Sequence, residues 1–285
     1  VLPSLGLIPV AILVGYLLYH LRINSILATI LGLVLLLGLI LGGNILAINI
    51  NLKTGLFILL AYCFFASILP VNILLQPRDY LSSFLLFFGT GAGYLGLLIS
   101  HPVVNMPYYY KFATPEGYLW PVLFVTVACG AVSGFHALIS SGTSSKQIAN
   151  ERHAKKIGYG GMIAEGLVAV LAIIATAVLL NPSEDLKSSG PIAIFGKGYG
   201  LLTMSILGRH GSFMAITILN AFILTTLDTA TRIARYITEE LFKIKSRYLA
   251  TLLIVALSAV LAFSGKWNKI WPAFGASNQL VAALT

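Results

Sequence analysis

A run of small and polar residues interrupts one apolar stretch of the chain between Gly130 and Thr143. Its hydroxyls and its imidazole can form hydrogen bonds with a carboxylate or a peptide group. A membrane-spanning helix tolerates such a break only where the freed backbone faces protein or a water-lined cavity, and broken helices of this kind surround bound solutes. The run therefore predicts a broken helix whose substrate-binding residues are Ser133, Gly134, His136, Ser140, Ser141, Gly142 and Thr143.

Close helix packing is the alternative interpretation of the same run. The small residues Gly130 and Gly134 let two helices approach each other, and serines in a helix often donate back to its own carbonyl groups. His136 also has two interpretations: a donor of one hydrogen bond to a neighbouring helix, or a group that takes and gives a proton. Spacing does not separate these alternatives.

Glu165 lies in the next apolar stretch, seven residues after Gly158. A carboxylate inside a membrane usually faces a cavity, an ion or a cationic side chain, so we expect Glu165 to take part in ion coupling. If residues 158–161 form a loop instead of a helix, Glu165 lies nearer the interface and caps or anchors the helix.

Oxygen-bearing side chains also gather on both sides of Asp228. Residues three and four positions apart share one face of a helix, and hydroxyls beside a carboxylate suit Na⁺, a proton or a polar solute. The alternative for Asp228 is an ion pair with Arg232. Besides Glu165, the residues that we expect to bind a coupling ion, H⁺ or Na⁺, are Asn220, Thr225, Asp228, Thr229 and Thr231.

Two further stretches are polar, and their spacing assigns them no binding role. Arg78 and Asp79 follow Gln76 and Pro77, which indicates a cytoplasmic turn between two spans, structural or part of a gate. Residues 272–279 offer amide side chains near the start of the last apolar stretch.

The composition explains why these polar groups stand out. Of 285 residues, 58% are hydrophobic and only 9% are charged, with a mean hydropathy of +0.92, far from the usage of soluble domains. The formal charge of +9 comes from basic residues in the gaps between apolar runs, which fits loops beside anionic lipid and not a nucleic-acid groove. The two cysteines form no CxxC pair, so we expect no cofactor, metal site or disulfide.

The apolar runs predict an all-α, polytopic bundle of transmembrane helices, since about 20 helical residues cross a bilayer core. We expect one membrane domain over residues 1–285, in the cell inner membrane, with the basic loops around 146–156 and 232–247 in the cytoplasm. An outside loop from Asn181 to Lys197 and the short apolar piece over 199–207 indicate a half-helix or a surface helix before Arg209. A ninth span begins near 271, and eight precede it at 5–19, 26–41, 55–75, 81–100, 119–142, 159–180, 212–229 and 248–263.

The ends of the chain predict that it is an internal piece of a longer protein. It has no initiator Met, and its last residues stop within a rising apolar run. We therefore expect further helices of the same protein before Val1 and after Thr285.

The same polar stretches resemble the carbon starvation protein A family of peptide and pyruvate transporters. The similarity covers nearly the whole chain, in matching order, and the family's earlier spans with their own Gly-rich motif and its later spans have no counterpart here. The segments that carry the resemblance are QPRDYL (76–81), ACGAVSGFHALISSGT (128–143), IGYGGM (157–162), LDTATR (227–232) and WPAFGASNQL (271–280).

The resemblance implies a secondary transporter of the nutrient-starvation response, in which an ion gradient drives symport of peptides or of small carboxylates such as pyruvate. It also implies a fold related to the inverted-repeat, LeuT-like symporters. Residues 134–142 would then belong to one of two discontinuous helices at the substrate site, with the other before Val1. The partners would be a small-molecule substrate, the lipid bilayer and the remaining helices of the transporter.

Three other classes of membrane protein compete with this interpretation. A passive channel calls for rings of like residues or a repeated filter, and the chain shows neither. An intramembrane enzyme calls for a catalytic constellation, but the chain has no HExxH and no paired intramembrane aspartates. A non-transporting sensor or scaffold leaves no sequence signal, so it remains an alternative.

Overall fold

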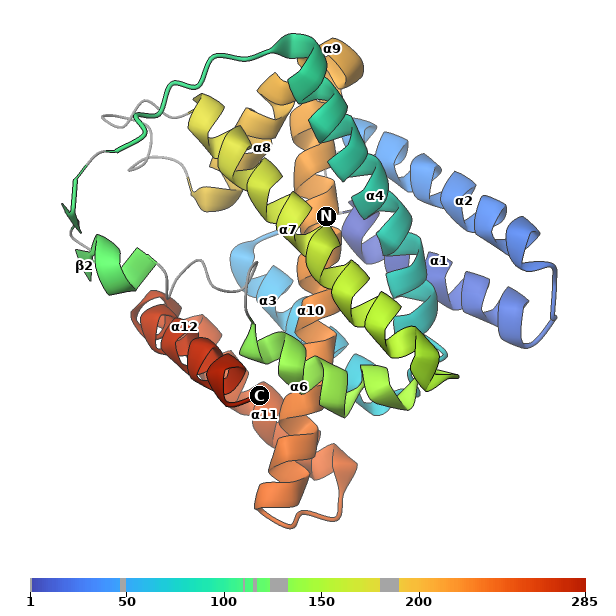
Figure 1. Cartoon of the computed structure of the whole chain (residues 1–285). Coiled ribbons are helices and arrows are strands. Elements are labelled where there is room, and N and C mark those ends of the chain that lie inside the picture. Colours follow the sequence, from blue (N-terminus) through green and yellow to red (C-terminus); the bar gives the residue numbers. More distant parts are fainter. Residues whose placement is uncertain (1, 47–49, 110, 115–116, 124–132, 180–189) are drawn as a thin grey trace. The chain divides into compact units, whose positions relative to one another are not determined.

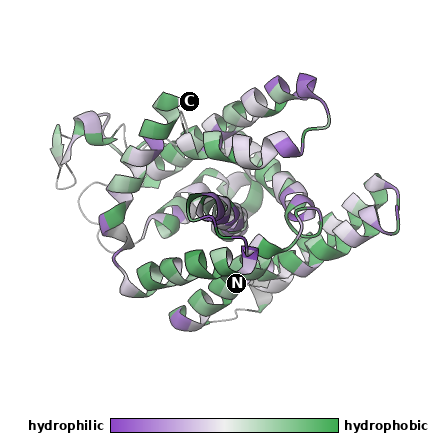
Figure 2. Ribbon diagram, turned by 90° about the horizontal axis from the view of Figure 1, so that it is seen from below, coloured by the Kyte–Doolittle hydropathy of each residue, from purple (hydrophilic) through white to green (hydrophobic). Residues whose placement is uncertain are grey.

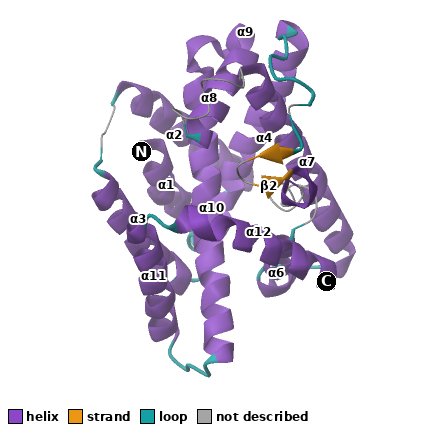
Figure 3. Ribbon diagram, turned by 90° about the vertical axis from the view of Figure 1, so that its left-hand side faces the viewer, coloured by secondary structure: helices purple, strands orange, loops and turns teal. Residues whose placement is uncertain are grey.

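The computed structural model describes residues 2–46, 50–109, 111–114, 117–123, 133–179 and 190–285. Helices make up nearly all of its regular structure, and strands β1 (Ala113–Thr114) and β2 (Gly117–Tyr118) form one short antiparallel pair (Figures 1 and 3). Within the described ranges, five helices are long and apolar enough to cross a bilayer. Most of the helical ribbon is hydrophobic (Figure 2). The prediction of an all-α, multi-pass membrane protein is therefore confirmed.

The chain folds into two compact units. The first combines Val1–Asn105 with Ile174–Val255, and the second combines Met106–Ile173 with Ala256–Thr285. Helices α7 (Ala154–Leu179) and α11 (Arg247–Ser264) contribute residues to both units. A single membrane domain over residues 1–285 stays a prediction.

The first unit is built around its longest helix, α10, which contacts α1, α2, α3, α4 and α8. Leu7, Leu36, Leu81 and Ala221 are among the residues of its apolar core, which the two N-terminal helices share with α4 and α10. The helices of this unit are α1 (Leu2–Tyr19), α2 (Ser25–Ile45), α3 (Leu52–Ile68), α4 (Leu75–Ser100), α8 (Pro191–Leu202), α9 (Met204–Leu207) and α10 (Gly211–Leu241).

The second unit contains two helices wholly its own, α6 (Gly134–Gly142) and α12 (Trp267–Leu284), which pack against each other. A π-type turn, Leu119–Leu123, and two 3-10 turns, Ser144–Lys146 and Glu151–His153, complete its described helical structure. The predicted fifth span, 119–142, is described only at its two ends, because residues 124–132 lie outside the described ranges.

The turn between the third and fourth predicted spans lies earlier than expected. Helix α3 ends at Ile68 and α4 begins at Leu75, so Arg78 and Asp79 lie inside a helix and the prediction of a corner at these residues is wrong. Pro77 is the third residue of α4, where a missing backbone N–H costs no helical hydrogen bond. The proline that ends the preceding segment is Pro70.

Helix α8 also begins earlier than expected. Residues 181–189 of the predicted outside loop lie outside the described ranges. The predicted loop extends to Lys197, but α8 starts at Pro191, a favoured residue at the first helical position. Ile194, Gly198 and Tyr199 are buried, so this short helix packs inside the first unit and is not a surface helix. The hydroxyl of Tyr199 donates to the Gly89 carbonyl of α4 at 2.6 Å.

Two glycines of α4 provide a matched test of this packing. A methyl group at Gly96 would collide with the Leu202 carbonyl of α8, whereas a methyl group at Gly91 has no neighbour within 4 Å. We expect Gly91→Ala to be neutral or to stabilise by up to about 1 kcal/mol through helix propensity. Gly96→Ala should instead destabilise by about 1–3 kcal/mol, because α8 must move away. Thermal unfolding in detergent measures both; equal melting temperatures would contradict the close contact of α4 and α8.

Candidate functional site

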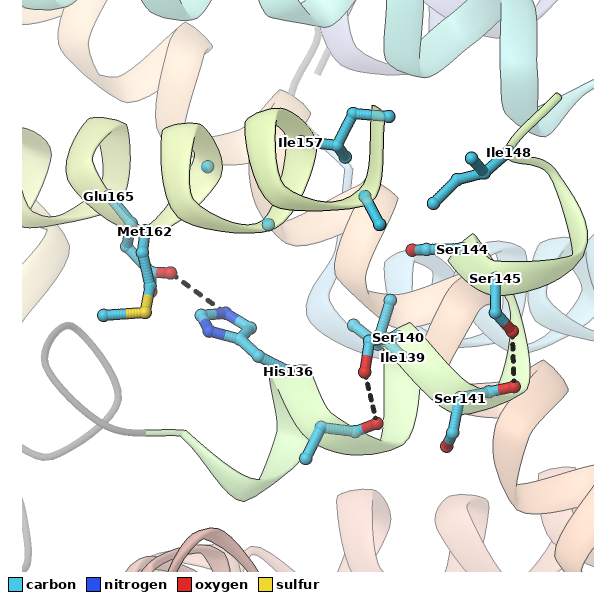
Figure 4. A pocket seen from close by; sticks show the side chains of 14 residues that line it. His136, Ile139, Ser140, Ser141, Ser144, Ser145, Ile148, Ile157, Met162 and Glu165 are labelled. Atoms are coloured by element: carbon cyan, nitrogen blue, oxygen red, sulfur yellow. Dashed lines mark hydrogen bonds and ion pairs between the residues drawn. The ribbon is translucent and has the colours of Figure 1, made fainter. Parts of the chain in front are cut away.

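A hollow of about 730 Å³ opens between α6 and α7 in the second unit, as Figure 4 shows. Its lining combines aliphatic side chains with hydroxyls, one imidazole and one carboxylate. A volume in this range is typical of ligand pockets. The lining residues are His136, Ala137, Ile139, Ser140, Ser141, Ser144, Ser145, Ile148, Ala154, Ile157, Gly158, Gly161, Met162 and Glu165.

The start of α6 determines where these side chains point. Ser133 has an extended backbone and caps the helix, its hydroxyl accepting from the His136 N–H at 3.3 Å. The Asn278 side chain of α12 accepts from the Phe135 N–H at 2.7 Å. Because the first N–H groups of a helix have no partner within it, these two acceptors stabilise a helix that begins at Gly134.

His136 and Glu165 meet across the hollow. His136 Nε2 lies 3.0 Å from Glu165 Oε2, and their side chains are 41% and 35% exposed. Residues 158–161 are helical, so Glu165 lies about 16 Å along α7 from Ala154, at 1.5 Å per residue. The alternative in which a loop at 158–161 brings Glu165 towards the interface is therefore wrong.

The other predicted substrate residues show features of both interpretations. Ser140 and Ser141 line the hollow, yet their hydroxyls donate to the Ala137 and Leu138 carbonyls at 2.8 and 3.2 Å, as in a packing helix. Each hydroxyl keeps acceptor capacity for a solute. Gly134 lies against the backbone of α12 and leaves no room for a side chain, which fits the packing alternative. Gly130 lies outside the described residues.

The last predicted residues of this run lie at the end of α6. Gly142 is the final residue of the helix and Thr143 follows it. The Thr143 hydroxyl is buried and has no hydrogen-bond partner in the part of the chain that the structure describes. Neither residue lines the hollow. Their role in substrate binding stays a prediction.

Asp228 has a partner that local spacing does not indicate. Its carboxylate forms a fully buried ion pair with Arg78 of α4, whose guanidinium approaches both carboxylate oxygens. The Tyr62 hydroxyl of α3 donates to Asp228 Oδ2 at 2.8 Å and accepts a hydrogen bond from Arg78. Asp79, half exposed, accepts from Arg78 Nη2 at 2.8 Å, the nitrogen that also donates to Asp228 Oδ1. Helices α3, α4 and α10 are thus joined by one polar network.

Arg232 donates hydrogen bonds to the C-terminal end of α3 instead of pairing with Asp228. Its Nη2 donates to the carbonyl oxygens of Ala66 and Leu69, both at 2.6 Å. The helical donor to the Ala66 carbonyl would be residue 70, a proline that has no N–H. The guanidinium replaces that missing donor, so the alternative of an Asp228–Arg232 ion pair is wrong.

The remaining predicted ion-coupling residues lie on α10 in the first unit. Thr225, Thr229 and Thr231 donate to carbonyls of their own helix at 2.7–3.0 Å. Thr229 also lies 3.4 Å from Asp228 Oδ1. Asn220 lines a separate, mostly apolar pocket of about 330 Å³ formed by α1, α3 and α10. Ion coupling by these residues stays a prediction, and Glu165 belongs to the second unit.

Three residues of these sites have no predicted role in the sequence. Tyr62 gives no local signal, Arg78 looks like a loop cation, and Asn278 is one amide in a polar stretch. The sequence signal that could have identified Arg78 is its position beside an otherwise apolar helix, because a charged side chain inside a membrane requires a partner. In the described ranges, no three His, Cys, Asp or Glu residues are grouped to hold a metal ion.

The chain matches the model of one protein family, described as carbon starvation protein CstA, over residues 2–197 and 181–285. The peptide transporter CstA of Escherichia coli strain K12 is 34% identical over 307 residues, covering 80% of this chain and 43% of that protein. The peptide transporter CstA of Helicobacter pylori is 30% identical, covering 97% of this chain and 52% of that protein. The pyruvate/proton symporter BtsT of E. coli K12 is 38% identical over 186 residues, covering 60% of this chain and 26% of that protein.

The chain thus spans about half the length of the curated relatives it matches. Both CstA alignments are longer than the 285 residues of this chain, so those relatives carry residues within the aligned region that the chain lacks. No solved structure matches the chain.

The buried ion pair of Arg78 and Asp228 predicts how substitutions at these two residues change the free energy of unfolding. Asp228→Leu or Arg78→Met alone leaves one charge without its buried partner, and each should lower the free energy of unfolding by about 3–5 kcal/mol. The double variant Arg78→Met/Asp228→Leu removes both charges and should recover most of that loss. Thermal unfolding in detergent measures the series.

Asp79→Asn is the matched control for this series. It removes the second carboxylate on the same guanidinium, at a side chain that is 48% exposed, so we expect a change of about 0–1 kcal/mol. A loss at Asp79 equal to that at Asp228, or a double variant as unstable as the single ones, would contradict the analysis.

Proposed function

Because the chain belongs to the carbon starvation protein CstA family, we propose that it forms part of an ion-coupled secondary transporter for peptides or small carboxylates such as pyruvate. The observation that carries the proposal is the hollow between α6 and α7, where an ion-pairing histidine and glutamate and several hydroxyls face open space in a chain of apolar helices. The names of the relatives, peptide transporter and pyruvate/proton symporter, support the class of solute.

Helix α6 is the proposed contact with the solute. It is nine residues long, begins at a capped Ser133 and presents His136, Ser140 and Ser141 to the hollow. A short helix with a defined start is what one half of a discontinuous transporter helix looks like. This supports the finer proposal of a LeuT-like inverted repeat in which α6 belongs to the broken helix predicted near residues 130–143, of which 130–132 lie outside the described ranges.

A proton is the coupling ion that the site suits best. His136 and Glu165 are both groups that exchange protons, and they lie in contact at the hollow. At Asp228, in contrast, Na⁺ would have to replace the buried guanidinium of Arg78. We therefore propose coupling through His136 and Glu165, which agrees with the printed name of the pyruvate/proton symporter.

The proposal includes the surroundings of the chain. The whole transporter would place it in the cell inner membrane as one membrane domain, in contact with lipid and with further helices of the same protein. It makes and breaks no covalent bond and is not an enzyme. A passive channel and a non-transporting sensor or scaffold are the alternatives, and they differ from a carrier in whether solute accumulates.

Accumulation against a gradient is the deciding measurement. We expect proteoliposomes containing the full-length protein to concentrate labelled alanylalanine or pyruvate when an inward proton gradient is imposed. A proton ionophore should reduce the internal concentration to the external one. Uptake that reaches only the external concentration would indicate a channel, and no uptake of any peptide or carboxylate would favour a sensor or scaffold.

Ser141 offers a test of the proposed contact. We expect Ser141→Ala to raise the solute concentration for half-maximal uptake by roughly 5–10-fold, as expected for one lost hydrogen bond. Ser83→Ala in α4 is the control, since that hydroxyl also donates to a carbonyl three residues earlier but lies outside the hollow. Equal uptake by Ser141→Ala and the wild type would remove Ser141 from the site.

A further inference from the structure

The charge in the hollow is unusual for a site that would bind an anion. Among the described residues that line it, Glu165 is the only acidic one and none is Lys or Arg. Within this described lining, His136 is the one side chain that can carry a positive charge, and it already lies against the Glu165 carboxylate. A small carboxylate entering this space would meet no unpaired cation and would face a like charge.

The Glu165 carboxylate keeps most of its hydrogen-bonding capacity. Oε2 accepts the hydrogen bond from His136, and across the described residues no other group donates to this side chain. A carboxylate has about four acceptor positions, so three stay available. The side chain is 35% exposed and reaches the hollow beside Met162 (Figure 4).

The rest of the lining is neutral and can donate and accept hydrogen bonds. Ser144 and Ser145 extend the row of hydroxyls that begins at Ser140 and Ser141, so four hydroxyls line the hollow together with aliphatic side chains. Peptide amide groups and small apolar side chains find partners on such a surface. At about 730 Å³ the space also greatly exceeds a three-carbon acid.

We propose that the Glu165 carboxylate binds the ammonium group of the transported solute, so that this hollow takes an amine-bearing peptide and not a keto acid. The inference rests on the proposed transport function and names the substrate class of the same site. A peptide amino terminus would use the free acceptor positions of Glu165, and an ammonium–carboxylate hydrogen bond is stronger than a neutral one. The hydroxyls of α6 would hold the neutral part of the peptide.

Binding to the purified full-length protein tests this inference separately from transport. We expect alanylalanine to bind about tenfold or more tightly than N-acetyl-alanylalanine, because acetylation removes the positive charge and leaves the rest of the peptide unchanged. Pyruvate should not displace bound alanylalanine. Isothermal titration calorimetry in detergent measures all three solutes.

Variants at Glu165 assign the preference to this side chain. Glu165→Gln keeps the shape and an acceptor for His136, so we expect it to fold and to bind the free and acetylated peptides within about twofold of each other. Glu165→Asp keeps the negative charge, so we expect it to bind the free peptide more tightly than the acetylated peptide, as the wild type does. Glu240→Gln makes the same change at an exposed position of α10 and should behave as the wild type.

Three results would overturn the inference: equal affinity of the wild type for the two peptides, no binding of alanylalanine, or a preference that survives in Glu165→Gln. These outcomes leave a proton-driven carrier for another solute intact. Conversely, a clear amine preference in binding without any concentrative uptake would reject the transporter proposal and leave Glu165 as the ammonium-binding residue.

Discussion

A polar group inside a bundle of apolar helices has to find its partner within the protein, because lipid offers neither hydrogen bonds nor counter-charge. In the first unit, Arg78 and Asp228 satisfy each other between α4 and α10, and Tyr62 of α3 completes the network. Helix α10 contacts five other helices of that unit. Its orientation, and with it the packing of its neighbours, therefore depends on this buried pair.

The Arg78–Asp228 and His136–Glu165 pairs differ in exposure, and this difference indicates different roles: one stabilises helix packing and the other can contact a solute. Arg78 and Asp228 are fully buried and have no access to solute. His136 and Glu165 are more than one-third exposed and open onto a hollow. A sealed pair contributes a defined packing of helices, whereas an open pair keeps acceptor positions that a solute or a proton can use.

Two helix ends in this chain are hydrogen-bonded by side chains of other helices. Asn278 of α12 accepts from the start of α6, and Arg232 of α10 donates to the end of α3, where Pro70 supplies no N–H. Such partners let a helix begin or stop inside an apolar environment at a low energetic cost. The start of α6 then directs His136 towards α7, so the geometry of the hollow follows from a backbone requirement.

Composition and the length of apolar runs are sufficient to predict a multi-pass helical membrane protein, because both depend on neighbouring residues only. The sequence also indicates that Glu165 would face a cavity or a cation. It does not reveal that the partner is His136, or that Asp228 pairs with Arg78, 150 residues away, instead of Arg232, four residues away. Tertiary structure decides these partners, since a buried charge pairs with whichever group the packing of distant helices brings within reach.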